Sequence, residues 1–216
     1  DADNRKKLPK GIVVPAEPAL THDIDFQSLQ VRLKGEGLPV LGDGDQFHYP
    51  LNHAQASLWL DQFLEHRFKD FGAYEDAISR QHRVMWHGVL TPMLNIGLLT
   101  PRQILDRTLE RAKQADIPLN SLEGFIRQIV GWREFMAVMY RRYGVTMRNG
   151  NFWKFEDRPI PDAFYTGNTG LPPIDDAIKH ALQTGYCHHI ERLMLLGNMM
   201  QLCGFHPDRV YVWFME

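Results

Sequence analysis

The strongest constraint on the fold is a near-helical spacing of apolar side chains that begins after Pro50 and recurs almost to the end of the chain. Residues three and four positions apart share one face of an α-helix, so this spacing predicts amphipathic helices. It is clearest in residues 52–69, which carry Ala54, Leu58, Leu60, Phe63, Leu64 and Phe68. No segment shows the alternation of a half-buried strand, and no fixed-period repeat is present. We therefore predict an all-α, multi-helix fold.

Local signals set the expected ends of the helices. Further helices are expected to start at Thr91-Pro92 and at Val210, and to cover 75–88, 100–116, 122–144, 174–185 and 188–204. Proline is tolerated in a first helical turn, which favours starts at the two Thr-Pro pairs. We expect Ser121 to cap the helix after it and Gly72 to stop the helix before it. Residues 144–173 are expected to be a loop.

The composition divides the chain near residue 50. Residues 1–50 are rich in Pro, Gly and charge, as in KKLPKG and VVPAEPAL. Such a segment buries little apolar surface, so we expect a linker or wrapping arm. Residues 51–216 are expected to form one helical domain that is incomplete at its C-terminal end.

The charge and cysteine content narrow the protein class. The formal net charge is −2, which excludes a globally basic DNA-binding protein but allows a local basic face. Two cysteines give no disulfide framework and favour a reducing compartment, so a cytoplasmic location is expected. No apolar run is long enough to span a bilayer, and the first residues lack the apolar core of a signal peptide. Because the chain lacks an initiator Met, we expect it to begin within a longer protein or after processing.

Three segments carry unusual combinations of residues. In the first, residues 86–92, a glycine and a hydroxyl stand at an expected helix start, where free amides attract phosphate. The alternative there is an ordinary capped junction. In the second, Trp132 and Phe135 adjoin Arg133 and Glu134, a combination that suits a pocket for a flat ligand. The alternative there is a core tryptophan beside a surface salt bridge.

The third segment, residues 186–192, contains adjacent histidines. His188 and His189 point about 100° apart on a helix, so they seldom share one metal. His189 is instead a candidate proton donor, because an imidazole titrates near neutrality. One alternative is that these are ordinary core or surface histidines. Another is a metal site formed by His180, His188 and His189, but we do not predict one.

A basic cluster follows the second segment. It contains Arg141, Arg142, Arg148, Lys154 and Arg158, with Phe152 and Trp153 between them. Cations interleaved with aromatic rings suit a DNA backbone and an exposed base. The alternative is a solvated helix end.

Taken in order, these segments resemble the photolyase/cryptochrome family, and specifically its bacterial branch of iron–sulfur (6-4) photolyases and prokaryotic cryptochromes. DADNRKKLPKG is similar to the linker after that branch's N-terminal α/β antenna domain, and LTPMLNIGLLTPRQ to its flavin-phosphate segment. GWREF is similar to its tryptophan–carboxylate helix, and TGNTGLPPIDDAI and GYCHHIERLMLLGN to the stretch beneath the flavin ring. HPDRVYVWFME is similar to the approach to the last part of the catalytic domain. The resemblance spans essentially the whole chain and implies most of a helical FAD-binding domain.

The resemblance also implies a role for each matched residue. The implied FAD-binding residues are Tyr74, His87, Gly88, Leu90, Thr91, Trp132 and Arg192. The implied catalytic residues are His189, His188 and Glu134. A histidine at position 189, where cyclobutane-dimer enzymes have asparagine, points to (6-4) repair, because reversing that adduct requires proton transfer as well as electron transfer. The DNA-binding residues are those of the basic cluster.

The implied activity is light-dependent, FAD-dependent repair of UV-damaged DNA by the full-length protein. The lesion leaves the duplex, reduced FAD donates an electron to it, and His189 supplies a proton. The branch also binds a 4Fe–4S cluster through four cysteines; here Pro172 and Pro173 stand near the upstream position, and Cys187 is the nearest thiol. A cluster is therefore an expectation for the full-length protein only. A cryptochrome-type photoreceptor and a flavin-free helical interaction module are the alternatives.

Overall fold

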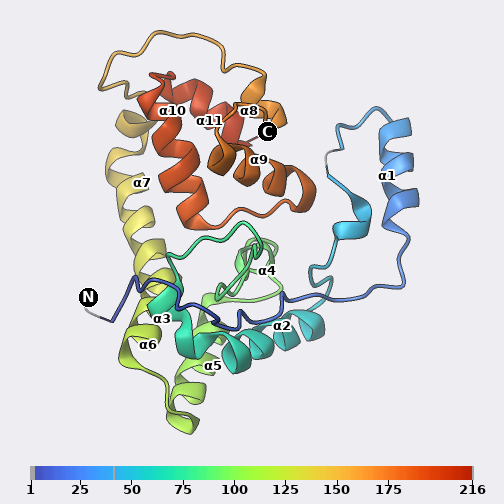
Figure 1. The fold of residues 1–216 in the computed structure, drawn as a ribbon, viewed down its shortest axis with the longest axis vertical. Helices are drawn as coiled ribbons and strands as arrows, with labels where there is room; N and C mark the ends of the chain where they lie inside the picture. The colour runs from blue at the N-terminus through green and yellow to red at the C-terminus, as the bar shows by residue number, and fades with distance from the viewer. Residues whose placement is uncertain (1–2, 41, 216) are drawn as a thin grey trace. The chain divides into compact units, whose positions relative to one another are not determined.

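The computed structural model describes residues 3–40 and 42–215, and every regular element within them is helical (Figure 1). The prediction of an all-α fold is confirmed. The chain forms two compact units, which we describe separately. Unit 1 contains Asp1–Asp23 and His48–Ala137, and unit 2 contains Ile24–Phe47 and Val138–Glu216. Within the described residues, no helix combines the length and the apolar character needed to cross a membrane.

Unit 1 is built from helices that start where the sequence supplies caps. Its elements are α2 (His53–His66), a 3-10 turn (Phe68–Asp70), α3 (Phe71–Tyr74), α4 (Thr91–Asn95), α5 (Pro101–Gln114), α6 (Leu119–Ile126), a π-helical stretch (Arg127–Gly131) and the start of α7 (Trp132–Arg148). Asn52 caps α2 by accepting from the Gln55 amide, and Thr100 forms a capping box with Gln103 at the start of α5. The helices predicted at 52–69, at Thr91 and at 100–116 are confirmed, with the first ending at His66.

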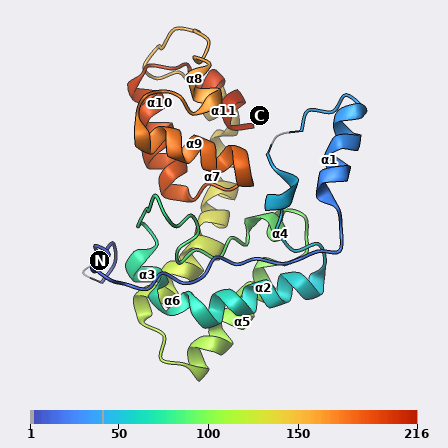
Figure 2. The same ribbon diagram turned by 45° about the vertical axis from the view of Figure 1, so that its right-hand side comes forward.

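A cluster of four phenylalanines holds unit 1 together. Phe63 of α2 lies at the centre, with its ring 5.9 Å from Phe68, 6.1 Å from Phe71 and 4.7 Å from Phe125. All four side chains are buried. Because they come from α2, the 3-10 turn, α3 and α6, the cluster fixes these elements relative to one another; α3 packs on α6 and α2 on α5 (Figures 1 and 2).

The stretch 75–88, expected to be helical, is irregular in the structure. Val84, Met85 and Trp86 are three consecutive residues that are all buried. A helix that packs through one face buries only the residues on that face. Three consecutive buried residues therefore favour an irregular chain. Met85 also has a positive φ of 52°. The helix prediction for this stretch is wrong.

Ser121 and Gly72 have roles other than those predicted. Ser121 lies inside α6, which begins at Leu119, so it is not an N-cap. Its fully buried hydroxyl donates to the Lys69 carbonyl at 2.7 Å and accepts from the Gly72 amide at 3.0 Å. Gly72 lies within α3 and does not stop a helix; a Cβ there would stand 2.5 Å from the Asn120 backbone.

The first part of the N-terminal arm is held against unit 1. The Lys6 amide donates to the Ala73 carbonyl at 2.9 Å, and Arg5 pairs with Asp76 at 2.8 Å. Farther along, the Glu17 carboxylate accepts from the Arg83 amide at 2.8 Å. The composition of residues 1–50 did not indicate helix α1 (Phe26–Gly35), which begins at an Asp25 cap in unit 2.

Unit 2 has its own apolar core. Besides α1, a 3-10 turn (Gly44–Gln46) and the rest of α7, it contains α8 (Ala163–Thr166), α9 (Pro172–Thr184), a π-helical stretch (Glu191–Gly197), α10 (Asn198–Leu202) and α11 (Pro207–Met215). The core residues are Ile160, Phe164, Ile174, Ala177, Ile178, Leu196 and Met200. Trp213 of α11 packs on this core and donates to the Phe164 carbonyl at 3.1 Å.

We predict that Ser121→Ala destabilises the protein by about 1–3 kcal/mol, because it leaves the buried Gly72 amide without an acceptor. Urea unfolding measures the change. The matched control is Ser79→Ala, which removes only a local bond from the Gln81 amide and is expected to cost less. Equal stabilities of the two variants would contradict the role given to Ser121.

Candidate functional site

The backbone before α4 is strained where the sequence predicts a phosphate-binding segment. Val89 has a φ of 50°, which is a genuine outlier for a β-branched residue. The buried Trp59 indole N–H holds the segment by donating to the Gly88 carbonyl at 2.9 Å. Strained residues persist only where their surroundings fix them, and they concentrate at functional sites. Leu90 is buried, whereas Thr91 is exposed at the start of α4, so Thr91 is the residue available to a ligand.

Two aromatic residues of the predicted site are tied to the core of unit 1. The half-buried Tyr74 ring lies 4.6 Å from the Trp86 ring, and His87 meets Phe71 edge-on at 6.1 Å. These contacts hold Tyr74 and His87 against the buried rings of Trp86 and Phe71.

An acidic cluster beside Tyr74 was missed by the sequence analysis. The Glu75 Oε2 atom is buried without a hydrogen-bond partner. Burial, followed by repulsion from Asp76, raises the pKa of Glu75 from 4.5 to about 7, while Arg127 and Arg5 oppose the shift. Glu123 adds further repulsion and is paired with Arg127. The sequence gives little signal for this arrangement, because the five charges come from three separate segments: Arg5, the adjacent pair Glu75 and Asp76, and the pair Glu123 and Arg127.

Trp132 is not the core tryptophan that we considered as an alternative. It follows directly on the π-helical stretch Arg127–Gly131, a distortion that often marks functional sites. Its side chain is 50% exposed and meets Phe135 edge-on at 5.6 Å. Glu134 is also exposed, and α7 has no buried residue. The ring is therefore accessible to a flat ligand.

In unit 2, His188 caps the helix that carries His189. The His188 Nδ1 atom accepts from the Ile190 amide at 3.3 Å, and the Glu191 carboxylate accepts from the His188 amide at 3.3 Å. The two bonds are reciprocal, as in a capping box, but the histidine accepts from the amide two residues on and not three. His188 and Glu191 are both buried. The sequence analysis missed Glu191, although its position three residues after the cap was the available signal.

His189 and Arg192 are more accessible than His188. His189 is half-buried, with its ring 5.9 Å from the His188 ring, and Arg192 is exposed. The Arg192 Nη2 atom donates to the Cys187 carbonyl at 3.4 Å. Arg192 belongs to the second π-helical stretch, Glu191–Gly197. A π-helical distortion thus ends directly before Trp132 and a second one contains Arg192.

Cys187, the thiol nearest to the expected cluster position, is half-buried. Burial, followed by the neighbouring Glu191 carboxylate, raises the pKa of the Cys187 thiol to about 12. A 4Fe–4S cluster stays an expectation for the full-length protein only.

The turn before α9 is organised by one carboxylate. Asp175 accepts from the Thr169 hydroxyl at 2.6 Å, from the Thr169 amide at 2.7 Å and from the Gly170 amide at 3.1 Å. The Thr169 hydroxyl bond, the largest cause, and then the amide bonds lower the pKa of Asp175. TGNTGLPPIDD therefore forms a fixed turn leading into α9.

The basic cluster divides into paired and unpaired cations. Arg148 forms an ion pair with Asp208 and stacks on the Tyr211 ring at 4.3 Å. Arg158 lies 3.8 Å from a Glu156 carboxylate oxygen. In the described part of the chain, Arg141, Arg142 and Lys154 are exposed and make no ion pair.

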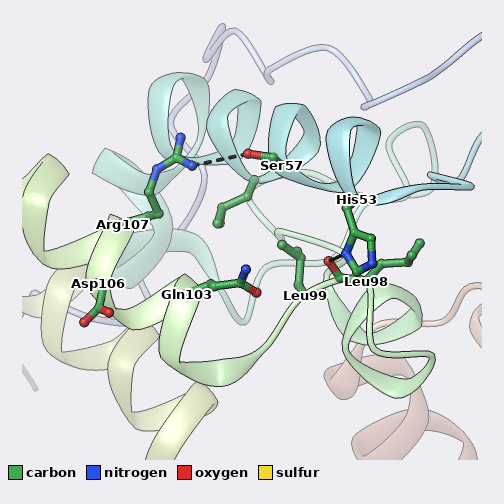
Figure 3. A pocket seen from close by; sticks show the side chains of 8 residues that line it. His53, Ser57, Leu98, Leu99, Gln103, Asp106 and Arg107 are labelled. Carbon is green, nitrogen blue, oxygen red and sulfur yellow. Dashed lines mark hydrogen bonds between the residues drawn. The ribbon is translucent and has the colours of Figure 1, made fainter.

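A shallow pocket between α2 and α5 contains none of the predicted site residues. Its volume is about 240 Å³, and hydrogen bonds join several of the residues that line it (Figure 3). The His53 Nδ1 atom meets the Leu98 carbonyl at 3.0 Å, and Arg107 bonds to Ser57 at 3.3 Å and pairs with Asp61. These pairings leave few free groups for a ligand.

The predicted residues fall into two sets. Unit 1 contributes Tyr74, His87, Gly88, Leu90, Thr91, Trp132 and Glu134, and unit 2 contributes His188, His189, Arg192 and the basic cluster. That the two sets converge on one ligand stays a prediction.

Comparison with known proteins finds relatives that include a photolyase and a cryptochrome. A (6-4) photolyase of Agrobacterium fabrum is 30% identical over all 216 residues, which correspond to 42% of that protein. An uncharacterised protein of Acanthamoeba polyphaga mimivirus is 41% identical over 113 residues, covering 52% of this chain and 85% of that protein. A cryptochrome DASH of Natronomonas pharaonis is 28% identical over 102 residues, covering 44% of this chain and 21% of that protein. No protein-family model matches the chain.

Solved structures show the same fold. A Synechocystis cryptochrome superposes with a TM-score of 0.66 at 21% identity, over 83% of this chain and 38% of that one. A class III photolyase of Agrobacterium tumefaciens superposes with a TM-score of 0.60 at 23% identity, over 76% of this chain and 34% of that one. The chain thus spans less than half of the photolyase and cryptochromes that it matches.

The raised pKa of Glu75 predicts a specific pH dependence of stability. Because the folded state holds the Glu75 proton more tightly than the unfolded state, stability is highest below the unfolded pKa and declines as the pH rises through the folded pKa. In the parent protein the free energy of unfolding should therefore fall between about pH 5 and about pH 8, and we expect Glu75→Gln to abolish this fall. Urea unfolding at several pH values measures it. The exposed Glu110→Gln is the control, and an unchanged pH profile in Glu75→Gln would refute the prediction.

Proposed function

The chain belongs to the photolyase/cryptochrome family, and on that premise we propose that the full-length protein repairs UV-damaged DNA in a light-dependent, FAD-dependent reaction. The family comprises DNA repair enzymes and blue-light photoreceptors. The observation that carries the repair proposal is the similarity along the whole chain to a (6-4) photolyase, together with a histidine at position 189. The whole protein is expected to include an N-terminal α/β antenna domain.

The exposed donor groups suit FAD. The Thr91 hydroxyl is available to a phosphate, the half-exposed Trp132 ring to a flat heterocycle, and the Arg192 guanidinium to a negatively charged ring. The neighbours Tyr74, His87, Gly88 and Leu90 contribute by holding the backbone before Thr91. When bound, FAD supplies light-driven electron transfer, and the protein orients it and tunes its charge.

Arg192 and His189 are assigned separate tasks in this proposal. Arg192 stabilises negative charge next to the reacting groups, because a guanidinium remains protonated. His189 holds the proton that a (6-4) adduct must receive and return. His188 and Glu191 orient His189 by capping its helix, so His188 acts as a positioning residue. Glu134, exposed beside Trp132, is assigned a polar contact with the damaged bases.

The basic cluster is proposed to bind the DNA backbone. Arg141, Arg142 and Lys154 have free charges for phosphates, which interact with cations regardless of sequence. Arg158 extends the same segment. Arg148, already paired with Asp208, supports the cluster by fixing the end of α7 to α11.

A photoreceptor function is the second candidate. It is favoured by the similarity to a cryptochrome DASH and by the fold shared with a cryptochrome. Light-dependent repair of a (6-4) lesion in an oligonucleotide by the full-length protein separates the two candidates. Absence of repair by FAD-loaded protein would remove the enzyme proposal and leave the photoreceptor. A flavin-free interaction module is tested by titrating the full-length protein with FAD.

We predict that His189→Asn in the full-length protein lowers the rate of (6-4) repair roughly 100-fold or more, because general acid catalysis is lost. FAD content, measured by absorbance, should stay unchanged. His66→Asn is the control, since its side chain is 63% exposed and lies in α2. A His189→Asn enzyme with full repair activity would end the assignment.

We also predict that the double change Arg141→Gln, Arg142→Gln weakens DNA binding and lowers the salt slope of log K by about two, one for each lost phosphate contact. A fluorescence anisotropy titration at several salt concentrations measures both. Arg102→Gln, on α5, removes one exposed charge outside the cluster and should leave the slope unchanged. A slope that does not change in the double variant contradicts the proposed contacts.

A further inference from the structure

Residues 3–6 of the N-terminal arm form a short strap that packs on α3 and on the start of α6 (Figures 1 and 2). The Asn120 side-chain amide donates to the Asp3 carbonyl at 3.1 Å, and the Lys6 amide donates to the Ala73 carbonyl at 2.9 Å. Both hydrogen bonds involve the strap backbone, so they hold this segment whichever side chains it carries.

The strap is weakly held, and its backbone is strained. Arg5 pairs with Asp76 at 2.8 Å, but the Arg5 side chain is 80% exposed, so the ion pair adds little to the stability of the contact. Arg5 also has a φ of 55°, a left-handed conformation that is uncommon for a residue other than glycine. Strained residues persist only where their surroundings fix them, and they occur in segments that switch between states. Attachment of the strap therefore depends on the residues against which it packs.

Glu75 stands in the middle of this contact. It lies between Ala73 and Asp76, which both bond to the strap. Its Oε2 atom is buried and has no hydrogen-bond partner, and the same holds for the Oδ1 atom of Asn4 in the strap. Both atoms are acceptors while Glu75 is ionised. A proton on Glu75 turns its carboxyl group into a donor and also removes a poorly solvated charge from the contact.

Burial is the main influence on the charge of Glu75. Burial and then repulsion from Asp76 raise its pKa to about 7, and Glu123 adds to the rise, whereas Arg127 and Arg5 oppose it. The segments packed on α3 carry further charged or titratable groups, among them Asp3, Lys6, Lys69, Asp70 and His87. None of these groups is among the causes of the shift. Because burial is the largest cause, uncovering Glu75 returns its pKa toward the ordinary value of 4.5.

We propose that residues 3–6 are a pH-sensitive strap, which is held on α3 while Glu75 carries a proton and is released when Glu75 loses it. This inference goes beyond the proposed function and requires neither flavin nor DNA. Because covering by the strap raises the pKa of Glu75, attachment is strongest below the ordinary pKa of 4.5 and weakens as the pH rises through about 7. Release also takes support from the neighbouring Tyr74, whose ring packs on Trp86 at 4.6 Å in the stretch that leads to Thr91.

The test is hydrogen exchange of the full-length protein, measured by mass spectrometry at about pH 5.5 and about pH 8.5. The protection factor of the Lys6 amide compares observed with intrinsic exchange, which removes the chemical effect of pH. In the parent protein we expect this factor to fall about tenfold between the two pH values. Glu75→Gln, which stays neutral, should keep the higher value at both. The Arg83 amide, which donates to Glu17 farther along the arm, is the internal control and should not change.

Arg5→Gln separates the effect of the proton from that of the ion pair. It should lower the protection of the Lys6 amide at both pH values and keep the pH dependence, because Arg5 is not the titrating group. Glu110→Gln, exposed on α5, should behave as the parent does.

Three outcomes would overturn the inference. They are a Lys6 protection factor that does not change with pH in the parent, an equal fall in Glu75→Gln, and an equal fall at the Arg83 amide, which would mean that the whole unit loosens. The parent measurement decides even if a variant fails to fold. Because the experiment involves neither light nor DNA, each of these outcomes leaves the repair proposal in place.

Discussion

The packing of three phenylalanines around Phe63 is the interaction on which the geometry of unit 1 depends. Phe68, Phe71 and Phe125 approach it from the elements that follow α2 and from α6. Aromatic rings bury large areas and prefer tilted or edge-on contacts, so the cluster fixes orientation as well as distance. Because α6 continues through the π-helical stretch into α7, the cluster also sets where Trp132 begins its helix.

The same core fixes the strained backbone that leads to Thr91. Trp59, one helical turn before Phe63, holds the Gly88 carbonyl, and burial of Val84, Met85 and Trp86 pins the chain before it. A positive φ at Val89 costs free energy that only such surroundings can offset. The start of α4, where Thr91 is exposed, is thereby held in place from the preceding irregular segment.

Unit 2 separates supporting residues from accessible ones in a comparable way. His188 and Glu191 are buried and satisfy the amides at the start of a helix, while His189 and Arg192 on that helix remain accessible. At the other end of the unit, Asp157 and Arg148 fasten the loop that exposes Phe152 and Trp153. In both places the charged and polar pairs order the backbone from which more accessible side chains project.

The sequence alone determined the features that depend on neighbours within one helical turn. Thr-Pro starts and apolar spacing predicted α2, α4 and α5, and the ordered motifs identified the family. The tertiary structure decided what depends on distant partners. Ser121 was expected to be a cap but bonds to groups 49 and 52 residues away, and the pKa of Glu75 is raised first by burial among other segments, then by the adjacent Asp76 and by Glu123 of α6. Local patterns record which face of a helix is apolar, but burial on all sides, as at Val84–Trp86, exists only once the other elements have packed around it.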